Sequence, residues 1–249
     1  MGEPMTAPTR RDTSKRDGVL VAVLVLVALG LIIYLATSRS GEDAKAGTEP
    51  GPQQTSSAET GSSPLADLPR RETGDPMALG ATDAPVTMVM YEDYRCPFCA
   101  KFSRDIAPSL IDRYIDAGVL RMEWRDLPIF GEQSLLAARA GRAAAEQGRF
   151  WEFTEAVYAA APDRGHPDLT ADALRDFARE AGVDDLDRFT KDMNSDRFDA
   201  AIETDIREGT GVGVSSTPTF VVNGQPVLGA QPLDTFTSVI DAAADAAHD

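Results

Sequence analysis

Hydrophobic and polar residues change their spacing several times along the chain, and each change marks an expected element. Residues 85–91 have the composition of a strand and lead directly into a pair of cysteines. Over residues 99–114 the apolar positions then repeat at helical spacing, with Pro108 inside the pattern, where it should kink the helix. Residues 119–124 alternate between apolar and polar and predict a second strand.

The second half of the chain is predicted to form several helices and then a hairpin. The stretch from about 132 to 210 carries successive apolar patterns at helical spacing. The period then returns to two, because residues 219–222 and 227–228 flank an Asn-Gly pair, which is a strong turn signal. A last helix follows over residues 232–247. We therefore expect an α/β fold with a mixed sheet between helices, into which the helical block is inserted.

An apolar run near the N-terminus has the length of a membrane span. Residues 19–36 are almost uninterrupted Val, Leu, Ile and Ala, and residues 18–37 are enough to cross a bilayer as a helix. Cations are more numerous before the run than shortly after it, so residues 1–17 should be cytoplasmic and the rest outside. A cleaved signal peptide is the alternative, but the run exceeds its usual apolar length. We predict an uncleaved transmembrane signal anchor.

Polar residues dominate the segment that follows the run. Residues 38–76 are rich in Gly, Ser, Thr, Pro, Glu and Gln and cannot bury enough surface to offset the entropy of ordering. We expect a flexible extracytoplasmic linker there. The remaining residues, 77–249, are numerous enough to form a core and are predicted to be the folded domain.

Charge excludes one class of partner. The chain has 249 residues, of which 43% are hydrophobic and 26% charged, as in ordinary globular proteins, and its formal net charge is −16. Such a chain repels nucleic acid, and it has no run of Lys and Arg that could follow a phosphate backbone. We expect no nucleic-acid partner.

The only two cysteines stand in one motif, Cys96-Pro97-Phe98-Cys99, between a predicted strand and a predicted helix. A thiolate is the nucleophile of disulfide exchange, and a helix N-terminus lowers the pKa of a thiol placed there. Pro97 suits the first helical turn, where its missing N–H costs nothing. In an exported chain this pair would form a disulfide. The motif predicts a redox-active disulfide that needs no metal or organic cofactor.

Two other interpretations of the cysteine pair remain open. It could be half of a zinc site, but zinc takes four ligands, and the other soft ligands are His166, in a Pro/Gly loop, and His248, the penultimate residue. It could also be a chance pair of buried thiols. The preceding strand, Pro97 and the helix start argue against chance.

Several segments together resemble the DsbA-like branch of the thioredoxin superfamily, and in particular the membrane-anchored thiol:disulfide oxidoreductases of the bacterial envelope. The resemblance covers about 77–249 and implies a thioredoxin-like fold. The helical block at about 132–210 then matches the inserted helical domain that separates DsbA-like proteins from plain thioredoxin. Any one segment is a weak signal, but the combination is specific. The segments are 83–87, 94–99, 150–153, 213–220 and 223–224.

The resemblance assigns roles to the site residues. It makes Cys96 the exposed nucleophile and Cys99 the more buried partner. Thr217-Pro218 matches the cis-proline loop, which lies beside the disulfide and offers the backbone of Thr217 to a bound peptide; an ordinary proline at a strand start is the alternative. The strongest oxidants of the family have histidine where this chain has Phe98. Phe98 supplies no charge or donor to a thiolate, so it should make the disulfide less oxidising.

The chain departs from the family pattern at one further position. Many relatives carry a buried acid six residues before the first cysteine, where this chain has Met90. Glu92 or Asp93 could substitute through water, but we expect both to be exposed charges at the strand end. Arg95 is either a cation that offsets Phe98 or a solvent-exposed side chain.

The resemblance implies dithiol–disulfide exchange, chiefly disulfide formation, in exported cysteine-containing proteins. It further implies a quinone-linked membrane re-oxidase of the DsbB or VKOR kind. The location would be the cell membrane, with a single pass, a cytoplasmic N-terminus and an extracytoplasmic catalytic domain. Two rivals remain: an envelope reductase or isomerase of the same fold, and a non-catalytic thioredoxin-like adaptor that binds peptide beside Pro218.

Overall fold

The computed structural model describes residues 63–248, and the side chain of residue 248 lies outside that description. The predicted cytoplasmic tail, the predicted anchor at 18–37 and the linker up to residue 62 all fall outside the described part. Within residues 63–248, no helix is both long and apolar enough to span a bilayer.

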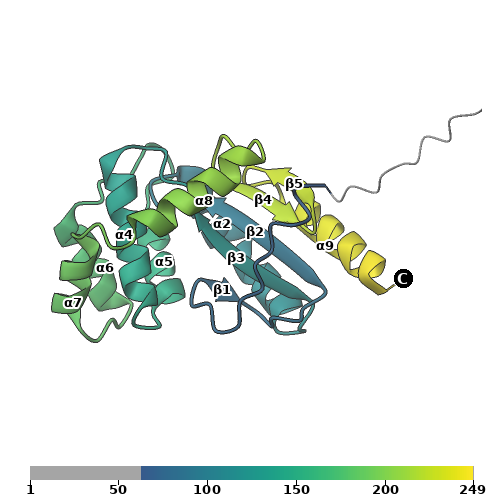
Figure 1. The fold of residues 1–249 in the computed structure, drawn as a ribbon, viewed down its shortest axis with the longest axis horizontal. Coiled ribbons are helices and arrows are strands. Elements are labelled where there is room, and N and C mark those ends of the chain that lie inside the picture. Colours follow the sequence, from purple (N-terminus) through teal and green to yellow (C-terminus); the bar gives the residue numbers. More distant parts are fainter. Residues whose placement is uncertain (1–62, 249) are drawn as a thin grey trace, which may run out of the picture. The chain divides into compact units, whose positions relative to one another are not determined.

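The described residues fold around a five-stranded sheet with the strand order β1-β3-β2-β4-β5 (Figure 1). β2 pairs with β3 in parallel, and the other neighbouring pairs are antiparallel, so the sheet is mixed as predicted. The short strand β1 was not predicted from the sequence. The strands are β1 (Ala78–Leu79), β2 (Val86–Glu92), β3 (Leu120–Asp126), β4 (Thr219–Val222) and β5 (Gln225–Leu228).

The crossover from β2 to β3 is helical and broken where the sequence predicts. α2 (Pro97–Asp105) ends one residue before α3 (Ala107–Leu110), which contains Pro108, and a π-helix (Ile111–Ile115) follows. The predicted kink is confirmed as a break. A proline ring clashes with the carbonyl four residues earlier, which a continuous helix cannot accommodate.

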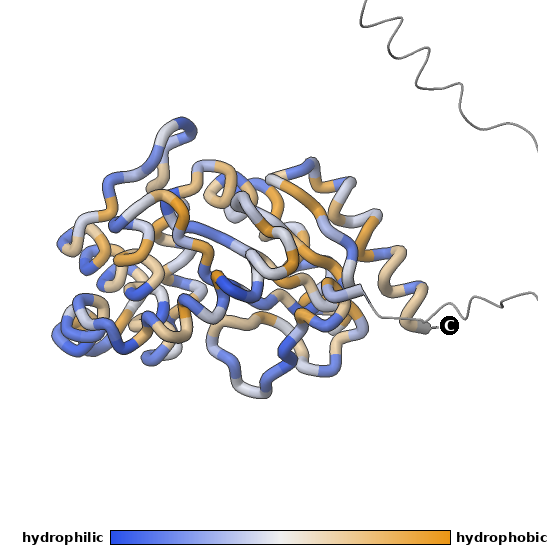
Figure 2. The backbone as a smooth tube through the Cα atoms, turned by 45° about the horizontal axis from the view of Figure 1, so that its top comes forward, coloured by the Kyte–Doolittle hydropathy of each residue, from blue (hydrophilic) through white to orange (hydrophobic). Residues whose placement is uncertain are grey.

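α2 and the C-terminal helix α9 (Leu233–His248) pack on the same face of the sheet. The ring centroids of Phe102 on α2 and Phe220 on β4 are 4.3 Å apart, and those of Phe220 and Phe236 on α9 are 5.0 Å apart. Figure 2 shows α9 alternating between hydrophobic and hydrophilic residues, as one buried helix face requires. This aromatic contact holds α2, and therefore the cysteine motif at its start, against the sheet.

The predicted helical block lies between β3 and β4 in the chain and beside the sheet in space (Figure 1). α4 is rich in buried alanines, which allow close contact with its neighbours α5 and α7. α5 also contacts α2, so the block supports the helix that begins at the cysteine motif. The helices are α4 (Glu132–Ala145), α5 (Phe150–Ala159), α6 (Ala171–Glu180), α7 (Leu186–Met193) and α8 (Asp199–Gly211).

Residues 63–76 do not behave as the linker that the sequence predicts. Leu68 is buried, and the backbone N–H groups of Arg70 and Arg71 donate to the two carboxylate oxygens of Glu123 at 2.9 and 2.8 Å. The polar composition was misleading because a single buried leucine and hydrogen bonds to a buried charge hold this segment. The folded part therefore begins before residue 77.

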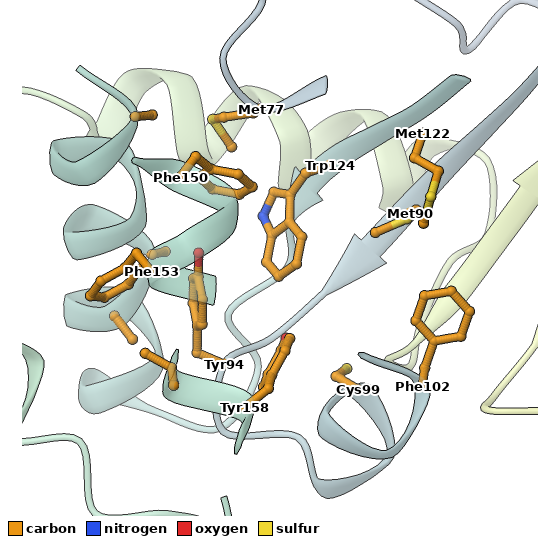
Figure 3. Close-up of a cluster of buried hydrophobic side chains, with 14 of the residues drawn as sticks. Met77, Met90, Tyr94, Cys99, Phe102, Met122, Trp124, Phe150, Phe153 and Tyr158 are labelled. Atoms are coloured by element: carbon orange, nitrogen blue, oxygen red, sulfur yellow. The ribbon is translucent and has the colours of Figure 1, made fainter. Parts of the chain in front are cut away.

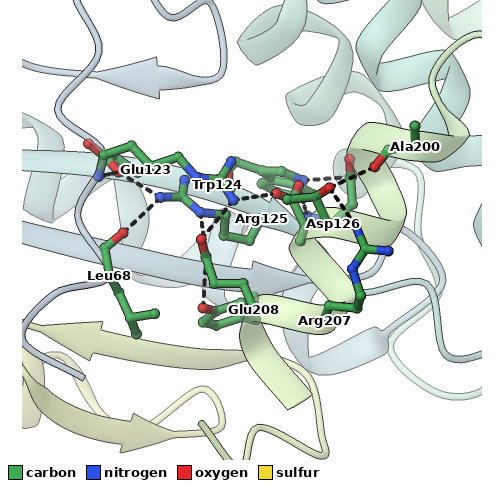
Figure 4. A network of polar contacts seen from close by, with 12 residues as sticks. Leu68, Glu123, Trp124, Arg125, Asp126, Ala200, Arg207 and Glu208 are labelled. Carbon is green, nitrogen blue, oxygen red and sulfur yellow. Dashed lines mark hydrogen bonds and ion pairs between the residues drawn. The ribbon is translucent and has the colours of Figure 1, made fainter. Parts of the chain in front are cut away.

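Glu123 belongs to a buried network of charges between β3, residues 68–71 and α8 (Figure 4). Its carboxylate accepts from Arg121 Nε and Arg125 Nη2, both at 2.9 Å, and Arg125 Nε donates to Glu208 on α8 at 2.9 Å. Burial alone would raise the pKa of Glu123, but these donors and the two backbone N–H groups lower it to about 2. The carboxylate thus stays ionised inside the protein.

Candidate active site

Cys96 is the N-cap residue of α2, and Pro97 occupies the first helical turn, as predicted. Cys96 has extended backbone angles, φ −79° and ψ 118°, and the backbone N–H of Cys99 donates to its Sγ at 3.4 Å. A sulfur at this position meets the free N–H groups and the positive end of the helix dipole. The local sequence therefore places Cys96 where a thiolate is stabilised.

The structure corrects the prediction that Cys96 is exposed. Cys96 is only 2% exposed and Cys99 is 0% exposed, whereas Phe98 between them is 61% exposed. Cys96 is covered because its thiol lies against the loop at Thr217 and donates to the carbonyl oxygen of that residue at 3.3 Å. Exposure thus separates the two cysteines only slightly.

Acidity separates the two cysteines clearly. Hydrogen bonds lower the pKa of Cys96 to about 6, although burial alone would raise it. The Cys99 thiol has the largest effect, followed by the Thr217 hydroxyl and the backbone N–H groups of Cys99 and Phe98. Burial raises the pKa of Cys99 well above its ordinary value. At neutral pH, Cys96 is therefore a thiolate and Cys99 a neutral thiol.

This asymmetry predicts the pH dependence of alkylation in the reduced protein. Because only the thiolate reacts, the rate at Cys96 should fall to half its plateau near pH 6 and decline further below it, while Cys99 stays unmodified near pH 7. Iodoacetamide labelling followed by peptide mass spectrometry, from pH 4 to 9, measures both. A midpoint at 8.5 or above for Cys96 would contradict the assigned stabilisation of its thiolate.

Glu92 is a site residue that the sequence interpretation misplaced. We expected an exposed charge, but Glu92 is 2% exposed, and neither of its carboxylate oxygens has a hydrogen-bond partner among residues 63–248. Burial raises its pKa to about 8; the nearby Cys99 thiol lowers the pKa, and the charge of Cys96 raises it. Glu92 therefore lies next to the cysteines as a largely protonated acid.

The period of the strand explains how Glu92 takes the place of the missing acid. Met90 and Glu92 are two residues apart on β2, so their side chains leave the same face of the sheet. Glu92 therefore lies one strand repeat closer to Cys96 than Met90, the position at which the resemblance leads us to expect an acid. The two-residue period of a strand could have predicted that the Glu92 side chain leaves the same face of the sheet as Met90.

Asp93 and Arg95 shape the loops around the motif. The predicted exposure of Asp93 is wrong, and Arg95, for which exposure was one of two alternatives, is half-buried. Asp93 is 2% exposed, and its carboxylate accepts from the backbone N–H groups of Arg95 at 2.8 Å and Ile129 at 2.7 Å. Arg95 donates to the carbonyl oxygens of Phe130 at 2.7 Å and Pro167 at 3.0 Å. These bonds join two loops of the helical block to the cysteine motif.

Thr217 and Pro218 lie beside Cys96, and the peptide bond between them is cis, as predicted. Antiparallel pairing of Tyr91 with Thr219 brings this loop to the end of β2, across a long separation in sequence. The hydroxyl of Thr217 is buried and otherwise unpartnered, so it is available to donate to the Cys96 thiolate. The structure thus brings all the predicted site residues together.

The zinc alternative finds no support in the described residues. No group of three or more His, Cys, Asp and Glu side chains within residues 63–248 is arranged to hold a metal ion. His166, one of the two histidines considered as ligands, makes a 2.8 Å hydrogen bond through Nδ1 to the carbonyl oxygen of Arg95. The side chain of His248 lies outside the described part.

Comparisons with known proteins agree with this geometry. A family described as "Thioredoxin" matches residues 72–242. The chain belongs to the thioredoxin family. The helical block between β3 and β4, together with the relatives described next, identifies it as a DsbA-like oxidoreductase. The chain is 28% identical to the disulfide bond formation protein D of Bacillus subtilis over 170 residues, which cover 68% of this chain and 76% of that protein.

Two further matches differ in how much of the other protein they cover. The oxidised BdbD structure from Bacillus subtilis has a TM-score of 0.64 and 28% identity, over 69% of this chain and 94% of that one. The chain is also 34% identical over 165 residues to the Na(+)/H(+) antiporter NhaA 3 of Salinispora tropica. That match covers 65% of this chain but only 24% of the antiporter, so this chain spans about a quarter of that relative.

Proposed function

We propose that this chain is a membrane-anchored, extracytoplasmic thiol–disulfide oxidase that forms disulfide bonds in exported proteins through Cys96 and Cys99. The observation that carries the proposal is the acidity difference between the two cysteines. The pKa of Cys96 is lowered to about 6, while burial raises that of Cys99. Such a pair has one good leaving group and one thiol that is retained inside the protein.

The first step consumes the protein disulfide. A substrate thiolate attacks Cys96 Sγ, the Cys96–Cys99 bond breaks, and its electron pair goes to Cys99. Since the buried Cys99 strongly disfavours the thiolate, it takes up a proton at once. Glu92, whose pKa is raised to about 8 by burial, is protonated at neutral pH and lies next to Cys99 to supply it.

The second step releases the product. The second substrate thiolate attacks the substrate sulfur of the mixed disulfide, and Cys96 leaves as a thiolate. The N-cap position stabilises this leaving group, because it receives the N–H of Cys99. Two electrons have then moved from the substrate dithiol to Cys96 and Cys99, and the substrate carries a new disulfide.

The surface around the motif suits an unfolded polypeptide. Only three large hydrophobic side chains within residues 63–248 are exposed, and the backbone of each lies in or next to a segment bonded to the site. Phe98 lies inside the motif, Ile129 donates its N–H to Asp93, and Leu228 precedes Gly229, whose N–H donates to the Pro218 carbonyl at 2.9 Å. Exposed apolar groups around a reactive site favour binding of polypeptide, here of segments that flank a reduced cysteine.

The location and the redox partner follow from the sequence and the family rather than from the described residues. The apolar run at 18–37 supports a single anchor with a cytoplasmic N-terminus, and the segment after it supports a tether. The electrons would pass from the reduced pair to a quinone-linked re-oxidase of the DsbB or VKOR kind in the same membrane.

Trapping of mixed disulfides tests the proposed chemistry against the adaptor alternative. In Cys99→Ala, the Cys96 thiolate can attack a disulfide of an oxidised substrate protein, but no second cysteine is left to release it. We expect a covalent complex on non-reducing gels that dithiothreitol dissolves. Cys96→Ala is the matched control and should form none, because the raised pKa of Cys99 keeps it a neutral, unreactive thiol. An adaptor would form no complex with either variant.

A further inference from the structure

A cavity of about 290 Å³ lies between α2, α3 and α5 and extends to Glu92 at the end of β2. Its only charged lining residues are carboxylates: the buried Glu92 at one side, and the exposed Asp112 and Glu155. No Lys, Arg or His lines it. The volume approaches the lower end of the range for small-molecule sites, roughly 300 Å³. The cavity is therefore largely apolar, and the charged side chains that line it are all acidic.

Aromatic rings form much of the wall. Phe102, Trp124, Trp151 and Tyr158 all line the cavity. Figure 3 shows Trp124 and Tyr158 on one side of Cys99 and Phe102 on the other. The face of an aromatic ring attracts a cation, and several rings around one space are the usual way in which proteins bind ammonium groups.

Two buried polar groups at this cavity lack partners within the described residues. Both carboxylate oxygens of Glu92 are without a hydrogen bond, and so is the indole N–H of Trp151. A buried polar group without a partner costs free energy, which a bound ligand or water could recover. Glu92 is 2% exposed, so a ligand that pairs with it must enter the cavity.

We propose that this cavity binds a small organic cation, an ammonium group carried on a compact apolar or aromatic body. The ammonium group pairs with Glu92 among the aromatic rings, and the apolar body fills the space towards α3. Asp112 and Glu155 add to the attraction as the cation approaches. This site is distinct from the peptide surface at Phe98, because Phe98 does not line the cavity.

A cation bound in the cavity would also affect the redox centre. Glu92 is the acid beside Cys99, and an ion pair with an ammonium group would hold it ionised and unable to supply a proton. The cation would then slow the step in which Cys99 leaves. This consequence rests on the proposed function, whereas the binding itself does not.

Calorimetric titration of the full-length chain with benzylammonium, and separately with uncharged benzyl alcohol, tests the binding. The titration is run at pH 8, where about half of the Glu92 carboxyls are ionised. We expect benzylammonium to bind at least about tenfold more tightly than benzyl alcohol and to change the fluorescence of Trp124 and Trp151, which line the cavity.

Three variants localise the interaction. Glu92→Gln should abolish the preference for the cation, and Glu155→Gln should weaken it severalfold. Glu152→Gln is the matched control, because Glu152 is also exposed on α5 but does not line the cavity, and it should bind as the wild type does.

Several outcomes would overturn the proposal: no binding of either probe, equal affinity for both, or an unchanged preference in Glu92→Gln and Glu155→Gln. Glu155→Gln alters only an exposed side chain, so it keeps the test valid if Glu92→Gln folds poorly. Exchange activity without a probe is measured in parallel. If the chain exchanges disulfides but does not bind the cation, only this inference is wrong. If it binds the cation but has no exchange activity, only the proposed function is wrong.

Discussion

Replacing Cys96 with serine should lower the rate of substrate oxidation by about three orders of magnitude or more, because the hydroxyl cannot form the disulfide on which the electron transfer depends. The rate is measured with a reduced dithiol peptide as substrate and glutathione disulfide as the terminal oxidant. Cys96 carries the chemistry because the hydrogen bonds at the start of α2 lower its pKa to about 6.

The control variant, Cys99→Ser, keeps the nucleophile Cys96 and removes its disulfide partner Cys99. Cys99→Ser also cannot turn over, but its Cys96 should still be alkylated with a midpoint near pH 6. The serine hydroxyl can donate in place of the Cys99 thiol, and the Thr217 hydroxyl and the N–H groups at the helix start remain. Cys96→Ser should lose the rapidly alkylated site altogether. Oxidation by Cys96→Ser at the wild-type rate would mean that the Cys96–Cys99 pair is not the redox centre.

Glu123→Leu should lower the free energy of unfolding by about 3–5 kcal/mol, because it removes the carboxylate that pairs with two buried guanidinium groups. Within residues 63–248, Arg125 keeps only its ion pair with Glu208. Arg121 and Arg125 are 4% and 0% exposed in their side chains, and both donate to Glu123 at 2.9 Å. The variant also removes the acceptor that holds the backbone of Arg70 and Arg71. Urea unfolding of the full-length chain, followed by circular dichroism, measures the loss.

Glu203→Leu is the matched control, since Glu203 is an exposed residue of α8, and we expect a change within about 0.5 kcal/mol. The pH dependence has a definite sign. Because the folded-state pKa of Glu123 is lowered to about 2, its contribution is complete above its ordinary pKa of 4.5 and is lost as the pH falls towards 2. Equal stability of Glu123→Leu and the wild type at pH 7 would contradict the role of this network.

Periodicity was sufficient to predict the elements that carry the site. The strand before the cysteines, the helix after them, the hairpin and the helical block all appear where the spacing of apolar residues placed them. The N-cap position of Cys96 followed from Pro97 and the change of period. These signals depend only on residues close together in the sequence, so they can be interpreted without knowledge of the tertiary contacts.

Burial of charge could not be predicted in the same way. The alternation in β3 predicts a strand with one polar face, but it does not show that residues 68–71 and α8 cover Glu123 and Arg125. Glu92 was missed for the same reason, because a charged residue at a strand end is usually exposed. Both groups are buried through partners distant in sequence, and their pKa values depend on those partners.

The reduction potential of the Cys96/Cys99 pair, measured on the full-length chain in glutathione buffers at pH 7, tests the proposed direction of electron flow most directly. The pKa of Cys96, about 6, lies between those of about 7 in thioredoxin and about 3.5 in DsbA. We therefore expect a potential between about −270 and −120 mV, above thioredoxin, since a more stable thiolate favours the reduced protein and makes its disulfide an oxidant. A value at or below about −270 mV would contradict the oxidase and identify an electron donor.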